Sequence, residues 1–332
     1  MSRLYTYKDA PAAGLAGERV VIAGFGNQGR AQAENLRDSG VDPLIALRPD
    51  GASWQAATDA GFVVKEVAEA SAEADILMML TPDETQAELF EAEIRPNLGS
   101  GSALGFSHGF AVGFGLLDPG PELDVFLVAP KAQGLKVREL YESGKGAAAL
   151  IAVERDTSGK AWSRALGYAE ALGCLRTGAL ETSFREEAIS DLFGEQAVLC
   201  GGLSELIRAA FDTLVARGYD PQIAYFETLH EVKILADLIH AKGIDGMRRH
   251  ISGTALWGDL SRGRRIIDAG TRERMDALLD EIESGSFARE WVDENKSGRS
   301  RLRERLEADA KHPIESAGKR VRSLMPWLEE EV

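Results

Sequence analysis

The feature that most constrains the fold is a glycine-rich turn set between an apolar run and a helix-like run. Val-Val-Ile-Ala occupies residues 20–23, and the turn follows at once. Its glycines match the pattern Gly-x-Gly-x-x-Gly, which allows a tight turn, a close approach to a pyrophosphate and close packing of helix on strand. The helix that follows adds amide donors and partial positive charge. We expect a dinucleotide there, bound by Gly24, Phe25, Gly26, Asn27, Gln28 and Gly29.

Strand-like and helix-like segments alternate over the first half of the chain. The strand-like segments are residues 19–23, 43–47, 74–80, 103–107, 124–129 and 147–153, with helix-like segments such as 30–38 and 85–94 between them. This alternation predicts a parallel sheet that helices cover on both faces. We therefore predict a Rossmann-type, dinucleotide-binding domain over residues 1–182.

The second half of the chain has a different character. Strand-like patterns disappear, and the helical stretches are residues 184–216, 221–241, 272–284 and 287–295. Residues 296–301 read as a short polar loop. We predict an all-helical domain over residues 183–328, so the fold class is α/β followed by all-α.

Composition excludes several classes of protein. The 332 residues carry a net charge of −15, which argues against a nucleic-acid-binding surface. No run approaches the length of about 18 apolar residues that a membrane span requires, and the first residues do not resemble a secretory signal. The two cysteines, Cys174 and Cys200, are too few for a disulfide framework. We expect a cytoplasmic protein without membrane or nucleic-acid partners.

Two pairs of carboxylates lie in the helical half. Asp191 and Glu195 form the first pair, and Glu227 and Glu231 form the second. A spacing of four residues places the members of a pair on the same face of a helix. Their neighbours are mostly apolar, which predicts interior helices, and unpaired acids there would be costly. Oxygen ligands without a nearby cysteine favour Mg²⁺, whereas the alternative is a solvated helix face.

The end of the second predicted strand bears on the choice of nicotinamide cofactor. An acidic residue there accepts hydrogen bonds from the ribose of NADH, whereas an arginine pairs with the 2′-phosphate of NADPH. Arg48 and Ser53 suit a 2′-phosphate, but Asp50 would repel one. The sequence favours NADPH and leaves NADH open.

Further motifs run in order through nearly the whole chain. They include Phe106-Ser-His-Gly-Phe110, Asp191-Leu-Phe-Gly-Glu-Gln196, Tyr225-Phe-Glu-Thr-Leu-His-Glu231 and Ile251-Ser-Gly-Thr-Ala255. With the glycine turn, this ordered set resembles ketol-acid reductoisomerase in its short (class I) form. The resemblance implies that Mg²⁺ promotes an alkyl shift in 2-acetolactate or 2-aceto-2-hydroxybutyrate. NAD(P)H then reduces the product to a 2,3-dihydroxy acid in the synthesis of branched-chain amino acids.

The resemblance also implies roles for individual residues. Two Mg²⁺ ions would share Asp191, Glu195 would hold one of them, and Glu227 and Glu231 would come from the partner subunit. Such shared sites imply a homodimer with intertwined, knotted helical domains. The remaining roles that the resemblance implies are catalysis by His108, Lys131 and Glu231, binding of the substrate carboxylate by Ser252, and a cofactor contact at Gly134.

Some positions depart from the family pattern. Ala132 and Gln133 replace glycine and proline after Lys131, Leu256 replaces an acidic residue, and Trp257 replaces tyrosine. A bulkier and less polar wall near Ser252 allows for a paralogue with another substrate. A simple reductase of 2-oxo acids or imines and a non-catalytic nucleotide sensor also stay open, although neither needs four acids.

Overall fold

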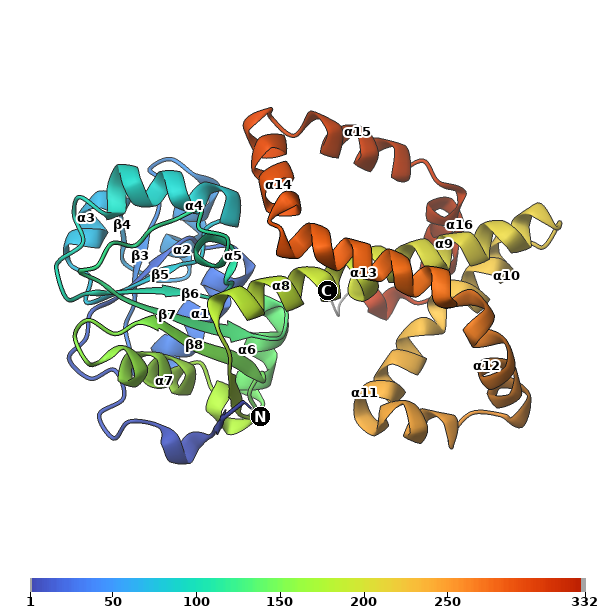
Figure 1. Cartoon of the computed structure of the whole chain (residues 1–332), viewed down its shortest axis with the longest axis horizontal. Coiled ribbons are helices and arrows are strands. Elements are labelled where there is room, and N and C mark those ends of the chain that lie inside the picture. The colour runs from blue at the N-terminus through green and yellow to red at the C-terminus, as the bar shows by residue number, and fades with distance from the viewer. Residues whose placement is uncertain (1, 330–332) are drawn as a thin grey trace. The chain divides into compact units, whose positions relative to one another are not determined.

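The computed structural model describes residues 2–329. The chain divides into two compact units, Met1–Ser190 and Asp191–Val332. The first unit contains the sheet, and all secondary structure in the described part of the second unit is helical (Figure 1). The division falls inside helix α8 (Phe184–Gly194), and the sequence boundary between residues 182 and 183 stays a prediction.

The sheet of the first unit has nine strands in the order β1-β9-β8-β7-β6-β5-β2-β3-β4. Their bounds are β1 Leu4–Tyr5, β2 Val20–Ala23, β3 Leu44–Ala46, β4 Val64–Lys65, β5 Ile76–Met79, β6 Ala103–Phe106, β7 Asp124–Pro130, β8 Ala149–Arg155 and β9 Ala179–Glu181. The six strands from β4 to β7 are parallel, and the strand order reverses between β2 and β5. This is the order of a doubly wound nucleotide-binding sheet, whose ligand site lies at the reversal.

The expected parallel sheet is confirmed for these six strands, and the rest of the sheet adds antiparallel pairs. β8 pairs with β7 antiparallel, β9 pairs with β8 parallel, and β1 pairs with β9 antiparallel. An apolar run indicates a strand but not its direction, because the connection before the strand decides the direction. The sheet is therefore mixed, with a parallel half that has the Rossmann order.

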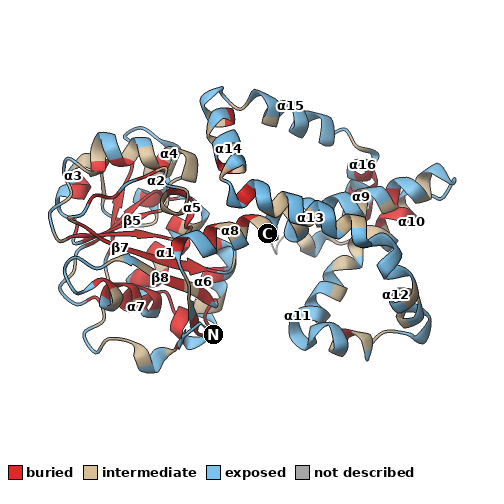
Figure 2. Ribbon diagram, viewed as in Figure 1, coloured by how far each residue is buried: buried red, intermediate tan, exposed pale blue. Residues whose placement is uncertain are grey.

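Helices cover both faces of the sheet, as predicted (Figure 1). Their bounds are α1 Asn27–Asp38, α2 Ala52–Asp59, α3 Val67–Ala72, α4 Asp83–Leu89, α5 Phe110–Gly113, α6 Gly134–Glu142 and α7 Ala161–Ala171. Successive residues of β2 enter different cores: Val20 and Ile22 belong to one apolar cluster, Val21 and Ala23 to the other. The strands are consequently buried on both sides (Figure 2).

The second unit is helical throughout its described part, which confirms the class predicted for it. Its helices after α8 are α9 Gly201–Ala216, α10 Pro221–Tyr225, α11 Val232–Arg248, α12 Gly253–Ile266, α13 Ala269–Glu283, α14 Ser286–Lys296, α15 Ser300–Asp309 and α16 Pro313–Arg322. Helices α12, α15 and α16 were not predicted, and α15 begins inside the expected polar loop. Within residues 2–329, no helix is both long and apolar enough to span a membrane.

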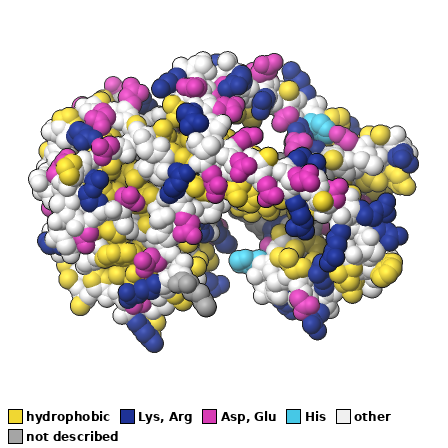
Figure 3. Space-filling model, viewed as in Figure 1, with side chains coloured by type: hydrophobic (Ala, Val, Ile, Leu, Met, Phe, Trp, Pro, Cys, Tyr) yellow, Lys and Arg dark blue, Asp and Glu magenta, His cyan; other side chains and the backbone are white. Residues whose placement is uncertain are grey.

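The expectation that the acidic pairs lie on interior helices is wrong for the described chain. Leu192 and Tyr225 are buried, but Val198 and Leu199 beside the first pair are 54% and 67% exposed. Helices α11 and α12 are exposed along most of their length (Figure 2), and apolar side chains lie among charged ones on the surface (Figure 3). The small core of this unit joins only parts of α9, α10 and α16. Too few helices pack together to enclose the acids.

A buried ion pair joins three segments of the first unit. Arg164 on α7 donates to the fully buried Asp124 of β7 at 2.9 Å and to Glu18 at 3.0 Å. Asp124 also accepts from the main-chain N–H of Ser158 at 2.9 Å. These bonds attach α7 and the segment before β2 to the sheet.

We expect Asp124→Ala to lower the free energy of unfolding by roughly 3 kcal/mol, because it leaves a buried guanidinium with too few partners. Urea unfolding followed by fluorescence measures the change. Lys136→Ala is the control, since it breaks an exposed pair with Glu139 and should cost less than about 1 kcal/mol. An equal effect of the two substitutions would contradict this account of the ion pair.

Candidate functional site

The three glycines of the turn have separate structural roles. A Cβ atom at Gly24 would lie 2.6 Å from the carbonyl oxygen of Leu80, and one at Gly29 would lie 2.3 Å from that of Gly24. A Cβ atom at Gly26 would meet no heavy atom within 4 Å. Gly24 and Gly29 are thus required for packing, whereas Gly26 leaves open space at the carboxyl end of β2.

The amino terminus of α1 faces that space with uncapped amide groups. Gly26 is the N-cap residue and has no side chain to satisfy them. The first main-chain bond of the helix runs from the N–H of Arg30 to the carbonyl oxygen of Gly26 at 2.9 Å. The N–H groups of residues 27–29 precede it, so they are available for an anion. The turn therefore fits the pyrophosphate of a dinucleotide.

Two predicted cofactor residues have side chains engaged elsewhere. The ring of Phe25 is buried and packs edge-on against Phe62, with ring centroids 5.6 Å apart. The side-chain amide of Gln28 donates to the carbonyl oxygen of Ala132 at 2.9 Å. The main-chain atoms of Phe25 and Gln28 remain available to contact a nucleotide.

Gly134, also predicted at the cofactor, begins α6 against the glycine turn. A Cβ atom there would lie 2.0 Å from the carbonyl oxygen of Asn27. The first turns of α1 and α6 therefore pack main chain against main chain, and no larger residue fits.

The segment after β3 offers both signs of charge. Arg48 and Asp50 are exposed, and Asp50 adopts a left-handed conformation with φ of 61°. Ser53 lies half-buried in the first turn of α2, whose N-cap, Gly51, has no side chain. A cation, a hydroxyl group and uncapped amides would suit a phosphate, whereas the carboxylate would oppose one.

His108 and Lys131 lie at the carboxyl ends of β6 and β7, and a buried carboxylate brings them together. Glu187 on α8 is 1% exposed, and it accepts from the ammonium of Lys131 at 2.6 Å and from the N–H of Gly109 at 2.7 Å. Nε2 of His108 lies 4.0 Å from Glu187, and its Nδ1 lies 2.8 Å from a carboxylate oxygen of Asp83. Sequence reasoning missed Glu187, although its spacing of four residues before Asp191 was a signal.

Helix α8 continues from Glu187 to the first predicted metal ligand. Asp191 follows Glu187 by one turn, so the helix itself sets their separation. His108, Glu187 and Asp191 each offer a ligand atom, and these atoms lie within 4.8 Å of one another. Among the described residues, Glu195, Glu227 and Glu231 are not part of this group, and all three are exposed.

Both acidic pairs meet a π-helical turn rather than a continuous α-helix. Glu195 begins the turn η4 (Glu195–Leu199), and Glu227 lies in η5 (Phe226–His230). Such turns are rare in proteins, and those that occur lie frequently at functional sites. Gly202 accommodates the first one, because a Cβ atom there would lie 2.0 Å from the carbonyl oxygen of Ala197.

Ser252 is the N-cap residue of α12 and is exposed. Its hydroxyl oxygen accepts from the N–H of Ala255 at 3.2 Å. Leu256 follows one turn later on the same helix, and Trp257 is exposed beside it. The predicted contact of Ser252 with a substrate stays a prediction.

The loop after β5 and helix α4, which follows it, contain polar groups that sequence reasoning did not identify. Gln86 is buried and donates to the carbonyl oxygen of Thr81 at 3.0 Å and to Asp83 at 3.2 Å. The side-chain oxygens of Gln86 and Thr81 are buried without a hydrogen-bond partner among residues 2–329. They lie next to the strand reversal, and such groups require a ligand or water.

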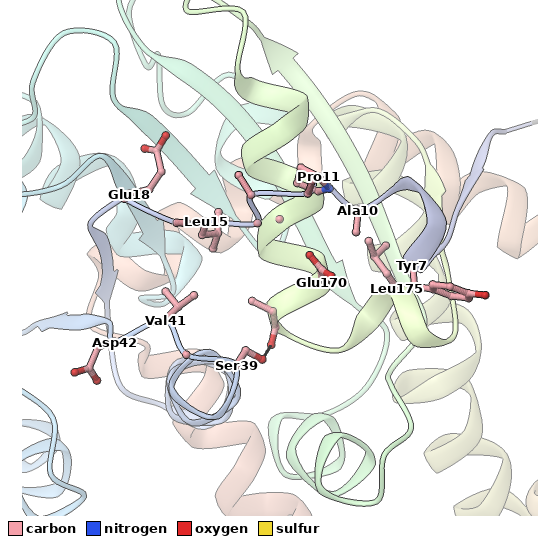
Figure 4. Close-up of a pocket in the computed structure, with 18 of the residues that line it drawn as sticks. Tyr7, Ala10, Pro11, Leu15, Glu18, Ser39, Val41, Asp42, Glu170 and Leu175 are labelled. Carbon is pink, nitrogen blue, oxygen red and sulfur yellow. Dashed lines mark hydrogen bonds between the residues drawn. The ribbon is translucent and has the colours of Figure 1, made fainter.

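A cavity of about 1080 Å³ lies elsewhere in the first unit (Figure 4). Its lining includes Leu15, Glu18, Ser39 and Glu170, and none of the predicted site residues. It also includes Arg19, which directly precedes β2, so the cavity lies at the amino ends of the strands. Ligands of such sheets bind at the carboxyl ends, where the glycine turn is.

Comparison with known families gives two matches that together span most of the chain. Residues 14–178 match a model described as the NADPH-binding domain of acetohydroxy acid isomeroreductase. Residues 184–327 match a model described as the C-terminal domain of ketol-acid reductoisomerase.

Solved structures give a similar picture. An NADH-preferring ketol-acid reductoisomerase from an uncultured archean is 39% identical, with a TM-score of 0.94 over 97% of this chain and 99% of that chain. An NAD-binding semialdehyde dehydrogenase protein from Cupriavidus necator is 18% identical, with a TM-score of 0.62 over 80% of this chain and 98% of that chain. The second likeness shows the fold alone.

The separate roles of the glycines predict opposite effects of two substitutions. Gly26→Ala should leave thermal stability nearly unchanged, since its φ of −84° suits alanine, and should weaken NADPH binding at least about tenfold. Gly29→Ala should cost about 1–3 kcal/mol of stability through overpacking. Thermal denaturation and fluorescence titration with NADPH measure the two effects. Normal NADPH affinity in Gly26→Ala would rule out this turn as the phosphate site.

Proposed function

The chain belongs to the ketol-acid reductoisomerase family, and we propose that it converts 2-acetolactate to a 2,3-dihydroxy acid at the carboxyl edge of the sheet. The family makes it an NAD(P)H-dependent oxidoreductase with isomerase activity in branched-chain amino-acid biosynthesis. The observation that best supports the site is Glu187, which brings together Lys131 and the loop of His108 one helical turn before Asp191.

Mg²⁺ is expected for the family, and the donor set suits it. Asp191, Glu195, Glu227 and Glu231 offer only carboxylate oxygens, which are ligands that Mg²⁺ prefers. We propose that Asp191 is shared by two ions, that Glu195 holds one, and that Glu227 and Glu231 of a second copy complete the site. When bound, the ions would polarise the carbonyl and hydroxyl oxygens of the substrate.

The side chains around the acids would orient the substrate and move protons. The alkyl shift removes a proton from the 2-hydroxyl group and delivers one to the 3-oxygen. We assign the removal to the carboxylate of Glu231 and the delivery to Lys131, whose ammonium Glu187 holds at 2.6 Å. Asp83 holds Nδ1 of His108 and so leaves Nε2 on the side of Glu187, where it can orient the substrate.

The second unit has the surface that a homodimer needs. Large apolar side chains there are exposed, among them Val198, Leu199, Ile223, Ile234 and Trp257. Large exposed apolar side chains that form one surface are typical of a subunit interface. We propose that two helical units intertwine over it, and that the enzyme works in the reducing cytoplasm, which suits its free cysteines.

Helix α12 is proposed to contact both ends of the substrate. Ser252 would bind the carboxylate from the amino terminus of the helix, where partial positive charge favours an anion. Leu256 and Trp257 follow within about one turn and would form the wall beside the alkyl group. This arrangement would favour an apolar side chain on the substrate.

We propose NADPH as the preferred cofactor. Arg48, the hydroxyl group of Ser53 and the uncapped start of α2 together offer donors to a 2′-phosphate. Asp50 opposes this choice, although its left-handed backbone belongs to the turn that precedes Gly51. The archaeal relative is described as preferring NADH.

Asp191→Asn should lower the Mg²⁺-dependent turnover of 2-acetolactate at least about 100-fold, because a neutral amide cannot serve as a shared ligand. The NADPH dissociation constant should stay within about threefold, since Asp191 is not part of the glycine turn. Asp276→Asn, an exposed acid on α13, is the control and should behave as the wild type. Normal turnover in Asp191→Asn would show that this carboxylate does not bridge the metals.

Arg48→Gln should raise the KM for NADPH by about 10–100-fold, the loss expected for one charge-assisted bond. The KM for NADH should change less than about threefold, because NADH lacks the 2′-phosphate. Steady-state kinetics with both cofactors measure the difference. A parallel rise of both KM values would place Arg48 against the adenine instead.

A further inference from the structure

Two glutamines on α1 form a chain of hydrogen bonds that the proposed chemistry does not use. Gln28 and Gln32 lie four residues apart on α1, so they share a face of the helix. The amide nitrogen of Gln32, which is 0% exposed, donates to the side-chain oxygen of Gln28 and to the hydroxyl oxygen of Ser107, both at 3.0 Å. Gln28 in turn donates to the carbonyl oxygen of Ala132 at 2.9 Å.

The donor-to-acceptor direction of these hydrogen bonds is fixed at both ends of the row. Burial raises the pKa of the Tyr168 hydroxyl well above its usual range, so the group stays protonated and donates to the oxygen of Gln32 at 2.8 Å. The carbonyl oxygen of Ala132 at the other end can only accept. Each glutamine amide therefore has one orientation, with its nitrogen toward the loops at the carboxyl ends of the strands.

Both loops that receive these bonds carry a residue of the proposed chemistry. Ser107 directly precedes His108, and Ala132 directly follows Lys131. We infer that Gln28 and Gln32 are positioning residues. They hold Ser107 and Ala132, the neighbours of His108 and Lys131, at a fixed place relative to the nucleotide-binding turn. The inference rests on the proposed function, because it takes His108 and Lys131 as groups that act on the substrate.

Hydrogen bonds suit this role better than apolar contacts would. Apolar packing at these positions would fill the same space but would not fix the direction of a loop. A buried polar chain with satisfied members fixes it, because each lost bond leaves a buried group unpaired. A catalytic group displaced by about 1 Å can lose on the order of 100-fold in rate.

Gln32→Met tests the inference, since methionine has a similar length and donates no hydrogen bond. We expect kcat for 2-acetolactate to fall about tenfold or more, while the NADPH dissociation constant stays within about threefold. Tyr168→Phe is the matched control: it removes the bond on the core side and keeps both donations by Gln32. It should lower the thermal midpoint as Gln32→Met does and leave kcat within about twofold.

A second variant keeps the test decisive if Gln32→Met fails to fold. Ser107→Ala removes only the hydrogen-bond acceptor beside His108 and should lower kcat. If Gln32→Met folds, the double variant Gln32→Met with Ser107→Ala should lose no more kcat than Gln32→Met alone. An unchanged kcat in Gln32→Met or Ser107→Ala would overturn the inference. A fall in NADPH affinity that accounts for the whole loss of turnover would also overturn it. Wild-type protein without Mg²⁺-dependent turnover would instead overturn the proposed function, and this inference with it.

Discussion

The carboxylate of Glu187 is almost fully withdrawn from solvent, and it tolerates burial because both of its oxygens are engaged. One accepts from Lys131 and the other from the N–H of Gly109. Removal of either partner would leave a buried charge uncompensated. Because Gly109 and Lys131 follow β6 and β7, this one group holds two strand ends against the first turns of α8. The same helix then leads to Asp191, so the start of the proposed metal site depends on this ion pair.

Much of the fold follows from local patterns, and the exceptions have physical reasons. The glycine turn predicted β2, α1 and the nucleotide site, because only glycine tolerates the contacts seen at Gly24 and Gly29. The direction of β8 was not predictable, since it depends on how the chain crosses after α6. β4 has only two residues, too few to form a pattern. Helix α15 has no buried residue, so it has no apolar face to detect.

The candidate site was predictable where residue type and strand ends coincide, as at His108 and Lys131. Glu187 was missed because an acid in the first turn of a helix is usually a solvated charge, and its burial comes from distant loops. Gln28 was predicted from its place in the turn, but sequence cannot tell which way an amide side chain points. The π-helical turns were also missed, because the apolar spacing on either side of them is compatible with an uninterrupted α-helix.

Because of the π-helical turns, the number of residues at the two acidic pairs is as restricted as the types of residue there. Each π turn accommodates one residue more than an ordinary α-helical turn does. Deletion of a single residue between Glu195 and Leu199 would let α8 and α9 merge into one regular helix. The displacement that the π turn gives to the side chains within it would then be lost. Homologues that keep this metal chemistry should therefore tolerate substitutions in these turns far better than a one-residue gap.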